Sequence, residues 1–229
     1  MANSLDLQEQ EQLDELKHFW RKYGNLITWT LTLVLAAYAA WMGWQWWQRD
    51  QAGKAGGMFS ELEKVVQQGD LQRSQQVLAD LKDRFGSTTY ATQAALLTAR
   101  LQFDKGQPEA AAQTLTWVVE KGSDSDYRTV ARLRLAGLLL DQKKYDVALK
   151  QLEGDSGAFA PLAADRRGDI LLAQGKRDDA VTAYRAALDG LEAESEYRRL
   201  VEAKLMAQGA LAAAPAAAAA STAASGARR

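Results

Sequence analysis

The segment GDILLAQGKRDDAVTAYRAA, residues 168–187, decides the fold because it encodes a complete helical hairpin. Gly168 and Leu171 lie one helical turn apart, Gly175 interrupts the pattern, and Ala180 and Tyr184 resume it four residues apart. A small residue on a first helix lets a second helix approach closely, and a bulky residue on the second helix occupies the space beside it. We therefore expect two antiparallel helices that pack closely at Gly168.

The same spacing recurs upstream, and it is typical of tetratricopeptide repeats. The small-residue series Ala99, Ala136 and Gly168 advances by 37 and then 32 residues. Unequal intervals are expected when loops vary in length, and residues 153–161 look like such a loop. One hairpin cannot bury its apolar face alone, so neighbours must stack. The matching positions are Ala136, Leu139, Tyr145, Ala148 and Leu152, then Ala99, Gly106, Ala111 and Leu115, then, in a degenerate unit, Leu62, Gly69, Ser74 and Leu78.

This pattern predicts an all-α chain with a tetratricopeptide-like solenoid over residues 58–208, closed by a capping helix at about 196–208. The alternative is an irregular helical bundle, since none of the units carries the proline that often ends such a repeat. The residues that we expect to pack the helices together are Ala99, Ala111, Ala136, Ala148, Gly168, Ala180 and Tyr184.

Residues 24–48 carry no ionisable side chain. As a helix they would rise about 37 Å, enough to cross a hydrocarbon core of about 30 Å. Tryptophans crowd one end and Trp20 and Tyr23 mark the other, as aromatic belts do at membrane interfaces. We predict a transmembrane helix in the lipid bilayer. A buried core helix and a signal peptide cleaved near Ala37-Tyr38-Ala39 are the alternatives, but the preceding arm is long and acidic and the apolar run continues past that site.

Three further segments complete the expected organisation. Residues 1–23 form an acidic, amphipathic arm, either a docking arm or a solubilising leader. Residues 49–57 form a linker with a hinge at 53–57, and the alanine-rich residues 209–229 form a disordered tail. Lys and Arg are nearly balanced on the two sides of residues 24–48, but the closer-set cluster of Lys17, Arg21 and Lys22 favours an N-terminus inside the cell.

The composition argues against an enzyme. The chain has no cysteine, one histidine (His18) and a net charge of -1, which excludes disulfides, thiol catalysis and a global attraction to nucleic acid. His18 lies at the membrane edge, so a Ser-His pair or a histidine metal site cannot form in the solenoid. The acid pairs Asp124/Asp126 and Asp178/Asp179 stand at predicted helix starts and suit N-capping. We expect no catalytic, cofactor or metal site.

The chain resembles the ancillary subunit of the bacterial SecYEG translocon over about residues 10–206. The residues that carry the resemblance are Gly43-Trp44-Gln45-Trp46-Trp47, Leu133-Arg134-Leu135-Ala136 and Ala163-Ala164-Asp165-Arg166-Arg167-Gly168-Asp169. It is most specific over 131–189, where Leu171-Leu172 and Gly175-Lys176 also match. The alanine-rich tail and the tryptophan-rich anchor depart from the family.

The resemblance implies a single-pass protein of the bacterial inner membrane, with a cytoplasmic N-terminus and a periplasmic repeat domain. Its implied partners are the SecYEG translocon, a membrane-anchored periplasmic peptidyl-prolyl isomerase chaperone, and secretory or membrane client proteins. Helical phase suggests that exposed side chains of the first helices contact the partner: Gln102, Arg134, Arg166 and Asp169. A non-catalytic scaffold is the leading hypothesis. A holdase that binds unfolded clients, and a membrane-tethered adaptor for a signalling or envelope complex, are the alternatives.

Overall fold

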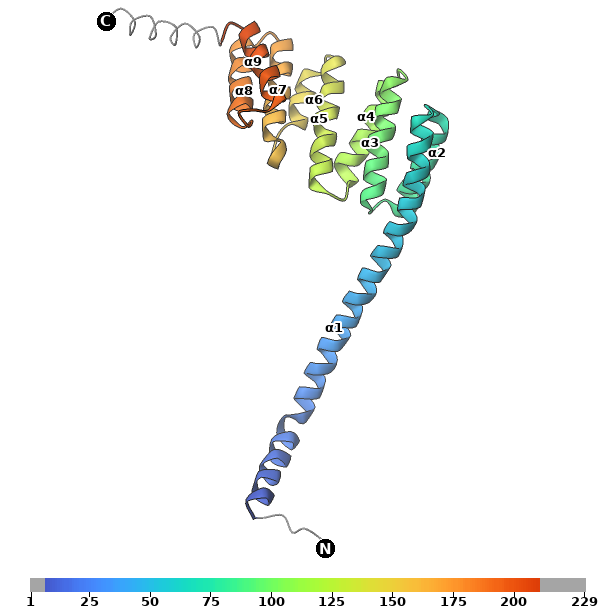
Figure 1. The fold of residues 1–229 in the computed structure, drawn as a ribbon, viewed down its shortest axis with the longest axis vertical. Coiled ribbons are helices and arrows are strands. Elements are labelled where there is room, and N and C mark those ends of the chain that lie inside the picture. The colour runs from blue at the N-terminus through green and yellow to red at the C-terminus, as the bar shows by residue number, and fades with distance from the viewer. Residues whose placement is uncertain (1–6, 211–229) are drawn as a thin grey trace, which may run out of the picture. The chain divides into compact units, whose positions relative to one another are not determined.

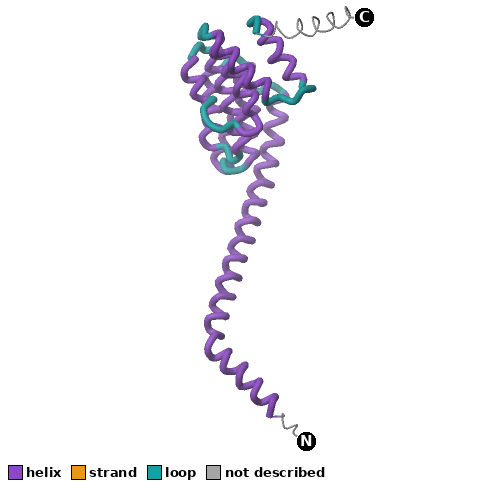
Figure 2. The backbone as a smooth tube through the Cα atoms, turned by 90° about the vertical axis from the view of Figure 1, so that its left-hand side faces the viewer, coloured by secondary structure: helices purple, strands orange, loops and turns teal. Residues whose placement is uncertain are grey.

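The computed structural model describes the backbone of residues 7–210 and the side chains from residue 17 onward, and every regular element in this part of the chain is helical (Figures 1 and 2). The all-α prediction is therefore confirmed. Most of the predicted tail lies outside the described residues, as do residues 1–6 of the arm. The elements are α1 Leu7–Gln67, α2 Leu71–Phe85, α3 Thr89–Asp104, α4 Pro108–Lys121, α5 Ser125–Asp141, α6 Tyr145–Gln151, the short 3-10 helix η1 Gly157–Phe159, α7 Ala160–Ala173, α8 Arg177–Asp189 and α9 Glu196–Ala207.

The chain divides into two compact units between Gly53 and Lys54. In the first unit, α1 contains a stretch that is long and apolar enough to cross a membrane, with a mean hydropathy of 1.5 and no buried side chains in that stretch. The hydroxyls of Thr28, Thr30 and Thr32 each donate a hydrogen bond of 2.8 Å to the carbonyl four residues earlier. These polar groups are thus satisfied within the helix, as a lipid environment requires.

The linker expected at residues 49–57 does not interrupt the helix, because α1 continues through it to Gln67. Packing explains why the glycines there stay helical. Ala55 and Leu62 are fully buried in the core of the second unit, and an added Cβ on Gly56 would lie 3.4 Å from the ring of Tyr90. Close packing in the second unit therefore offsets the low helix propensity of glycine, which is about 1 kcal/mol per residue.

In the second unit, four helical hairpins precede α9, and the same kind of turn connects the two helices of each hairpin. The last residues of α1 pair with α2, then α3 with α4, α5 with α6, and α7 with α8. Each turn has one residue with a positive φ: Gly69, Gly106, Lys143 and Gly175. The residue after it donates to the carbonyl five positions earlier, as in Gln107 to Gln102 and Lys144 to Leu139. This is a Schellman motif, in which a left-handed residue satisfies the carbonyls at a helix end.

The turns place the repeat in register across all four hairpins. Seven residues before each turn residue stand Leu62, Ala99, Ala136 and Gly168, and nine residues after it stand Leu78, Leu115, Leu152 and Tyr184. The structure buries both sets. In the last hairpin the smallest residue of the first set, Gly168, contacts the largest residue of the second set, Tyr184. A Cβ added to Gly168 would lie 2.5 Å from Cε1 of Tyr184. All seven residues expected to pack the helices together are buried.

This contact predicts non-additive stabilities. Gly168→Ala should lower the free energy of unfolding by about 2 kcal/mol through overpacking, and Tyr184→Leu by about 3 kcal/mol through lost packing. The double variant reproduces the Ala136/Leu152 pair of the preceding hairpin. Its loss should therefore be smaller than the sum of the two by about 1–2 kcal/mol. Denaturant unfolding of the full-length protein in mild detergent, followed by circular dichroism, measures all three.

Gly137→Ala is the matched control, because its added Cβ would meet nothing closer than 3.6 Å. We expect it to stabilise α5 by up to about 1 kcal/mol. Strict additivity of Gly168→Ala and Tyr184→Leu would show that the two side chains do not compete for the same space.

Candidate partner-binding groove

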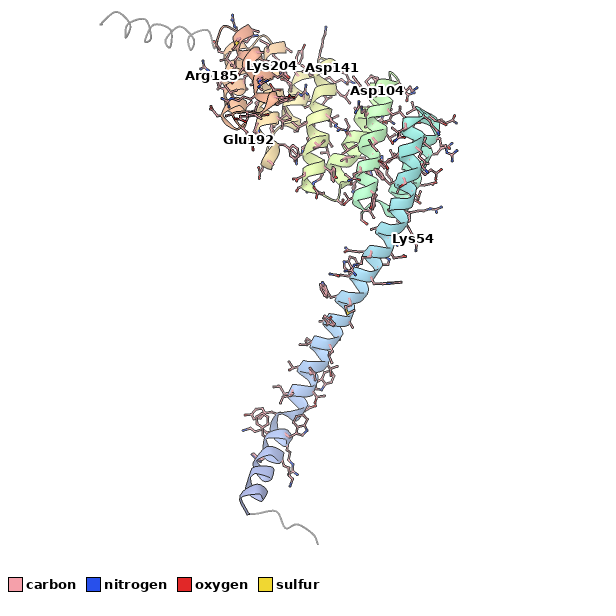
Figure 3. All side chains as sticks on the ribbon, viewed as in Figure 1. Lys54, Asp104, Asp141, Arg185, Glu192 and Lys204 are labelled. Carbon is pink, nitrogen blue, oxygen red and sulfur yellow. The ribbon has the colours of Figure 1, made fainter. Side chains whose placement is uncertain are left out.

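The first helices of three successive hairpins line one groove in the second unit. Its wall comes from α3, α5 and α7, its floor includes Leu115 of α4, and it encloses about 380 Å3. We call it the central groove; its lining residues are Ala99, Arg100, Phe103, Leu115, Arg134, Gly137, Leu138, Asp141 and Arg166. Asp104 and Asp141 occupy equivalent positions at the ends of α3 and α5 (Figure 3). The groove thus combines three guanidinium groups with apolar surface.

Two of the predicted contact residues, Arg134 and Arg166, face the central groove. Both stand nine residues before a turn residue, Lys143 or Gly175, so they occupy the same position in successive repeats. Gly137 lies beside the second arginine, since an added Cβ there would make an ordinary van der Waals contact of 3.6 Å with Cζ of Arg166. The repeat architecture therefore sets the two guanidinium groups side by side on adjacent helices.

Arg134 is the more exposed of the two residues, but its guanidinium has the less favourable electrostatic surroundings. Its Nη1 donates to the backbone carbonyl of Leu96 at 3.4 Å, and it forms no ion pair with any side chain that the structure describes. Burial lowers the pKa of Arg134, and the positive charge of Arg100 lowers it further. Arginine stays protonated at neutral pH despite such shifts, so this position holds a partly desolvated positive charge.

Gln102 does not face the groove, and the expectation that it is exposed is wrong. Its side chain is only 4% exposed, and it stands four residues before the turn residue Gly106. The equivalent positions in the other hairpins hold Val65, Leu139 and Leu171. This position therefore faces the second helix of the hairpin, and helical phase alone placed it on the wrong side.

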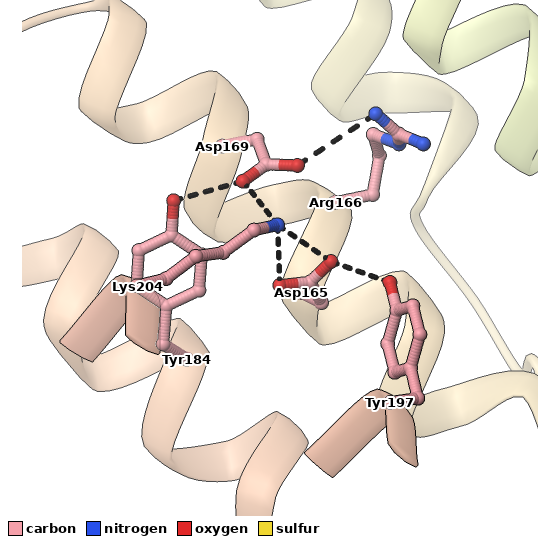
Figure 4. A network of polar contacts seen from close by, with 6 residues as sticks. All are labelled: Asp165, Arg166, Asp169, Tyr184, Tyr197 and Lys204. Atoms are coloured by element: carbon pink, nitrogen blue, oxygen red, sulfur yellow. Dashed lines mark hydrogen bonds and ion pairs between the residues drawn. The ribbon is translucent and has the colours of Figure 1, made fainter. Parts of the chain in front are cut away.

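Asp169 belongs to a polar network that joins α7 to α8 and α9 (Figure 4). Lys204 of α9 contacts both oxygens of Asp165, at 2.8 and 2.9 Å, and Oδ1 of Asp169 at 2.7 Å. The hydroxyl of Tyr184 donates to Asp169 at 2.9 Å, and that of Tyr197 donates to Asp165 at 2.6 Å. The network secures the capping helix to the last hairpin.

The network also reaches the central groove. Arg166 lies 3.6 Å from Oδ2 of Asp169, so this guanidinium is held between the groove and the network. Burial raises the pKa of Tyr184 and of Tyr197, and the neighbouring carboxylates raise both further. Both phenols therefore remain neutral hydrogen-bond donors to the aspartates well above neutral pH.

Sequence reasoning recognised part of this arrangement. Asp124 is the N-cap of α5, as expected, and accepts hydrogen bonds from the backbone of Asp126 and Tyr127. Asp178 and Asp179 lie inside the first turn of α8 and suit its dipole without capping it. Helical spacing on α5 could have identified Gly137, because it lies three residues after Arg134 and therefore on the same helix face. Lys204 had no such signal, since its partners lie 35 and 39 residues away.

The network generates a prediction about stability. Lys204→Met leaves Asp165, which is 2% exposed, without a cation, and leaves Asp169 with only the longer contact to Arg166. Removing one partner of a buried ion pair costs about 3–5 kcal/mol. Because Lys204 is itself partly exposed, we expect a loss near the lower end, about 3 kcal/mol, in the free energy of unfolding.

Arg185→Met is the matched control, since it removes one positive charge from an exposed side chain of α8. It should change the free energy of unfolding by less than about 0.5 kcal/mol. Thermal unfolding of both variants by circular dichroism makes the comparison. Equal stability of the two would mean that the network does not hold α9 in place.

Comparisons with known proteins agree with this architecture. A tetratricopeptide repeat-like domain matches residues 17–212. The chain is 32% identical over 201 residues to an ancillary SecYEG translocon subunit of Neisseria gonorrhoeae, covering 87% of this chain and 96% of that protein. It is 29% identical over 184 residues to the ancillary SecYEG translocon subunit of Escherichia coli, covering 79% and 87%. The predicted resemblance is confirmed, and the chain belongs to the family of ancillary SecYEG translocon subunits.

Proposed function

We propose that the chain is a non-catalytic scaffold of the inner membrane that associates with the SecYEG translocon and binds a partner protein in the central groove. The observation that carries this proposal is the groove itself, which three successive repeats build together. Repeat proteins use such extended surfaces to bind segments of other proteins. Both relatives are named as SecYEG translocon subunits, and we propose the translocon as a partner on that basis.

The proposed topology follows from α1. The apolar stretch at residues 24–48 crosses the membrane once, the arm at residues 1–23 is cytoplasmic, and the repeat domain is periplasmic. The closer-set basic cluster before the span supports this orientation under the positive-inside rule. In this topology the repeat domain lies on the side of the membrane where chains emerge from the translocon.

The scaffold works with other proteins in transferring clients. We propose that it acts beside a membrane-anchored periplasmic peptidyl-prolyl isomerase chaperone and helps secretory or membrane proteins reach periplasmic chaperones. The three arginines of the groove favour a scaffold over a holdase, because they let the groove select a charged partner and not any unfolded chain. Arg134, Arg166 and the neighbouring Asp169 remain our proposed contact residues.

Affinity purification tests the proposal. The full-length protein, extracted from native membranes in mild detergent, should retain the SecYEG subunits and the periplasmic isomerase, as identified by mass spectrometry. A protein that lacks residues 58–206 should no longer retain the isomerase, because the groove is removed. A protein that lacks residues 2–16 should still retain both the SecYEG subunits and the isomerase. The opposite pattern, with only cytoplasmic partners that depend on residues 2–16, would replace the scaffold by the adaptor. A full-length protein that retains no SecYEG subunit would contradict translocon association.

A further inference from the structure

We infer that the central groove selects acidic, extended peptide segments, in which carboxylates about three residues apart bind Arg134 and Arg166 and an apolar side chain contacts Phe103. This inference rests on the proposed function, because it specifies the partner of the same groove. The charges of the partner segment, and the spacing between them, then determine which segments bind.

The residues that line the groove carry more positive than negative charge. Arg100, Arg134 and Arg166 line the groove against a single lining carboxylate, Asp141, although Arg100 also pairs with Asp104 at 3.8 Å. Arg134 has no anionic partner among the described side chains, and its burial together with the charge of Arg100 makes a bound carboxylate favourable there. Guanidinium groups bind carboxylates in a planar, bidentate manner, so arginine suits this role better than lysine does.

The arginines are also held in place before a partner arrives. Arg134 donates a long hydrogen bond of 3.4 Å to the carbonyl of Leu96, and Arg166 forms an ion pair of 3.6 Å with Asp169. Fixed side chains lose less conformational entropy when they bind, which leaves more of the interaction energy for affinity. Asp169 engages Lys204 and Tyr184 as well, so Arg166 is only partly neutralised and can still accept a carboxylate.

The repeat geometry sets the spacing. Arg134 and Arg166 hold equivalent positions on α5 and α7, which contact each other, and packed helices lie about 8–10 Å apart. A polyproline II segment has three residues per turn and rises about 3.1 Å per residue, so its residues i and i+3 share one side about 9 Å apart. Acidic residues at this interval therefore match the two guanidinium groups.

The groove also has an apolar part. Phe103 of α3 is 47% exposed, and Leu138 and Ala99 line the surface beside it. A peptide with one apolar residue between its acids would cover this surface, at a gain of about 25 cal/mol per Å2 of apolar area removed from water. Charge would then set the choice of partner and the binding rate, and apolar contact would add affinity.

Segments of this chain are poor occupants. Residues 209–229 contain no Asp or Glu and two arginines, Arg228 and Arg229, so the groove repels them. The acidic arm before residue 24 lies across the membrane from the repeats in the proposed topology. The occupant is therefore a segment of another protein.

Peptide binding to the full-length protein in lipid nanodiscs tests the inference without SecYEG. The probe is a fluorescein-labelled peptide of about ten residues, which extends about 31 Å, with Glu at i, i+3 and i+6 and one Leu between them. Anisotropy should show binding that weakens as salt rises from about 0.05 to 0.5 M. A second peptide with the same composition but adjacent Glu residues should bind several-fold more weakly, and one with Gln for Glu should not bind.

Variants locate the site. Arg134→Glu and Arg100→Glu should each weaken binding of the spaced peptide by about tenfold or more, since each puts a repelling charge in the groove. Arg185→Glu is the control on α8, outside the groove, and should bind as the wild type does. The Arg100 side chain is highly exposed, so its variant should fold even if Arg134, whose guanidinium is partly desolvated, does not tolerate the change.

Equal binding of the spaced, clustered and Gln peptides, or no effect of both groove variants, would overturn the inference. Retention of SecYEG and the isomerase in native membranes would then still support the scaffold, so the two proposals fail separately. Binding that disappears in the groove variants and follows the acid spacing would establish the recognition rule, whatever the translocon result.

Discussion

The close approach of two helices at a small residue is the constraint on which the second unit depends. Three of the four hairpins set a small residue of the first helix against a larger one of the second helix, and Gly168 against Tyr184 is the extreme case, whereas the first hairpin pairs Leu62 with Leu78. Four left-handed turn residues keep these pairs in register. Because packing and turns repeat together, the first helices of successive hairpins lie adjacent, and equivalent positions on them form rows.

The central groove follows from those rows. Arg134 and Arg166 are neighbours because they occupy the same repeat position, and Gly137 lies beside the second guanidinium. The network around Lys204 then holds the last hairpin and α9 together beside Arg166. Structural packing and the candidate binding surface therefore share residues, and Asp169 links them directly.

Much of the fold could be predicted from the sequence, because periodicity and the small-to-large pairing are local signals. The hairpins, the loop at 153–161 and α9 lie where the pattern placed them. The continuity of α1 could not be foreseen, since its glycines suggest a break and the packing of Gly56 beside Tyr90 comes from another hairpin. Helical phase identified Arg134 and Arg166 as groove residues. It also placed Gln102 on the exposed side, wrongly, because the equivalent residues Leu139 and Leu171 occupy a position that packs inward. The Lys204 network joins residues with no sequence pattern in common.

Site-specific cross-linking in native membranes tests the central claim, that the groove is the surface that binds partners. A photoreactive amino acid replaces Phe103 in the groove or, as control, Val147 on α6, which is similarly exposed. If the groove binds partners, we expect adducts with a partner protein from position 103 and none from position 147. Adducts only from position 147, or equal yields from both positions, would contradict it.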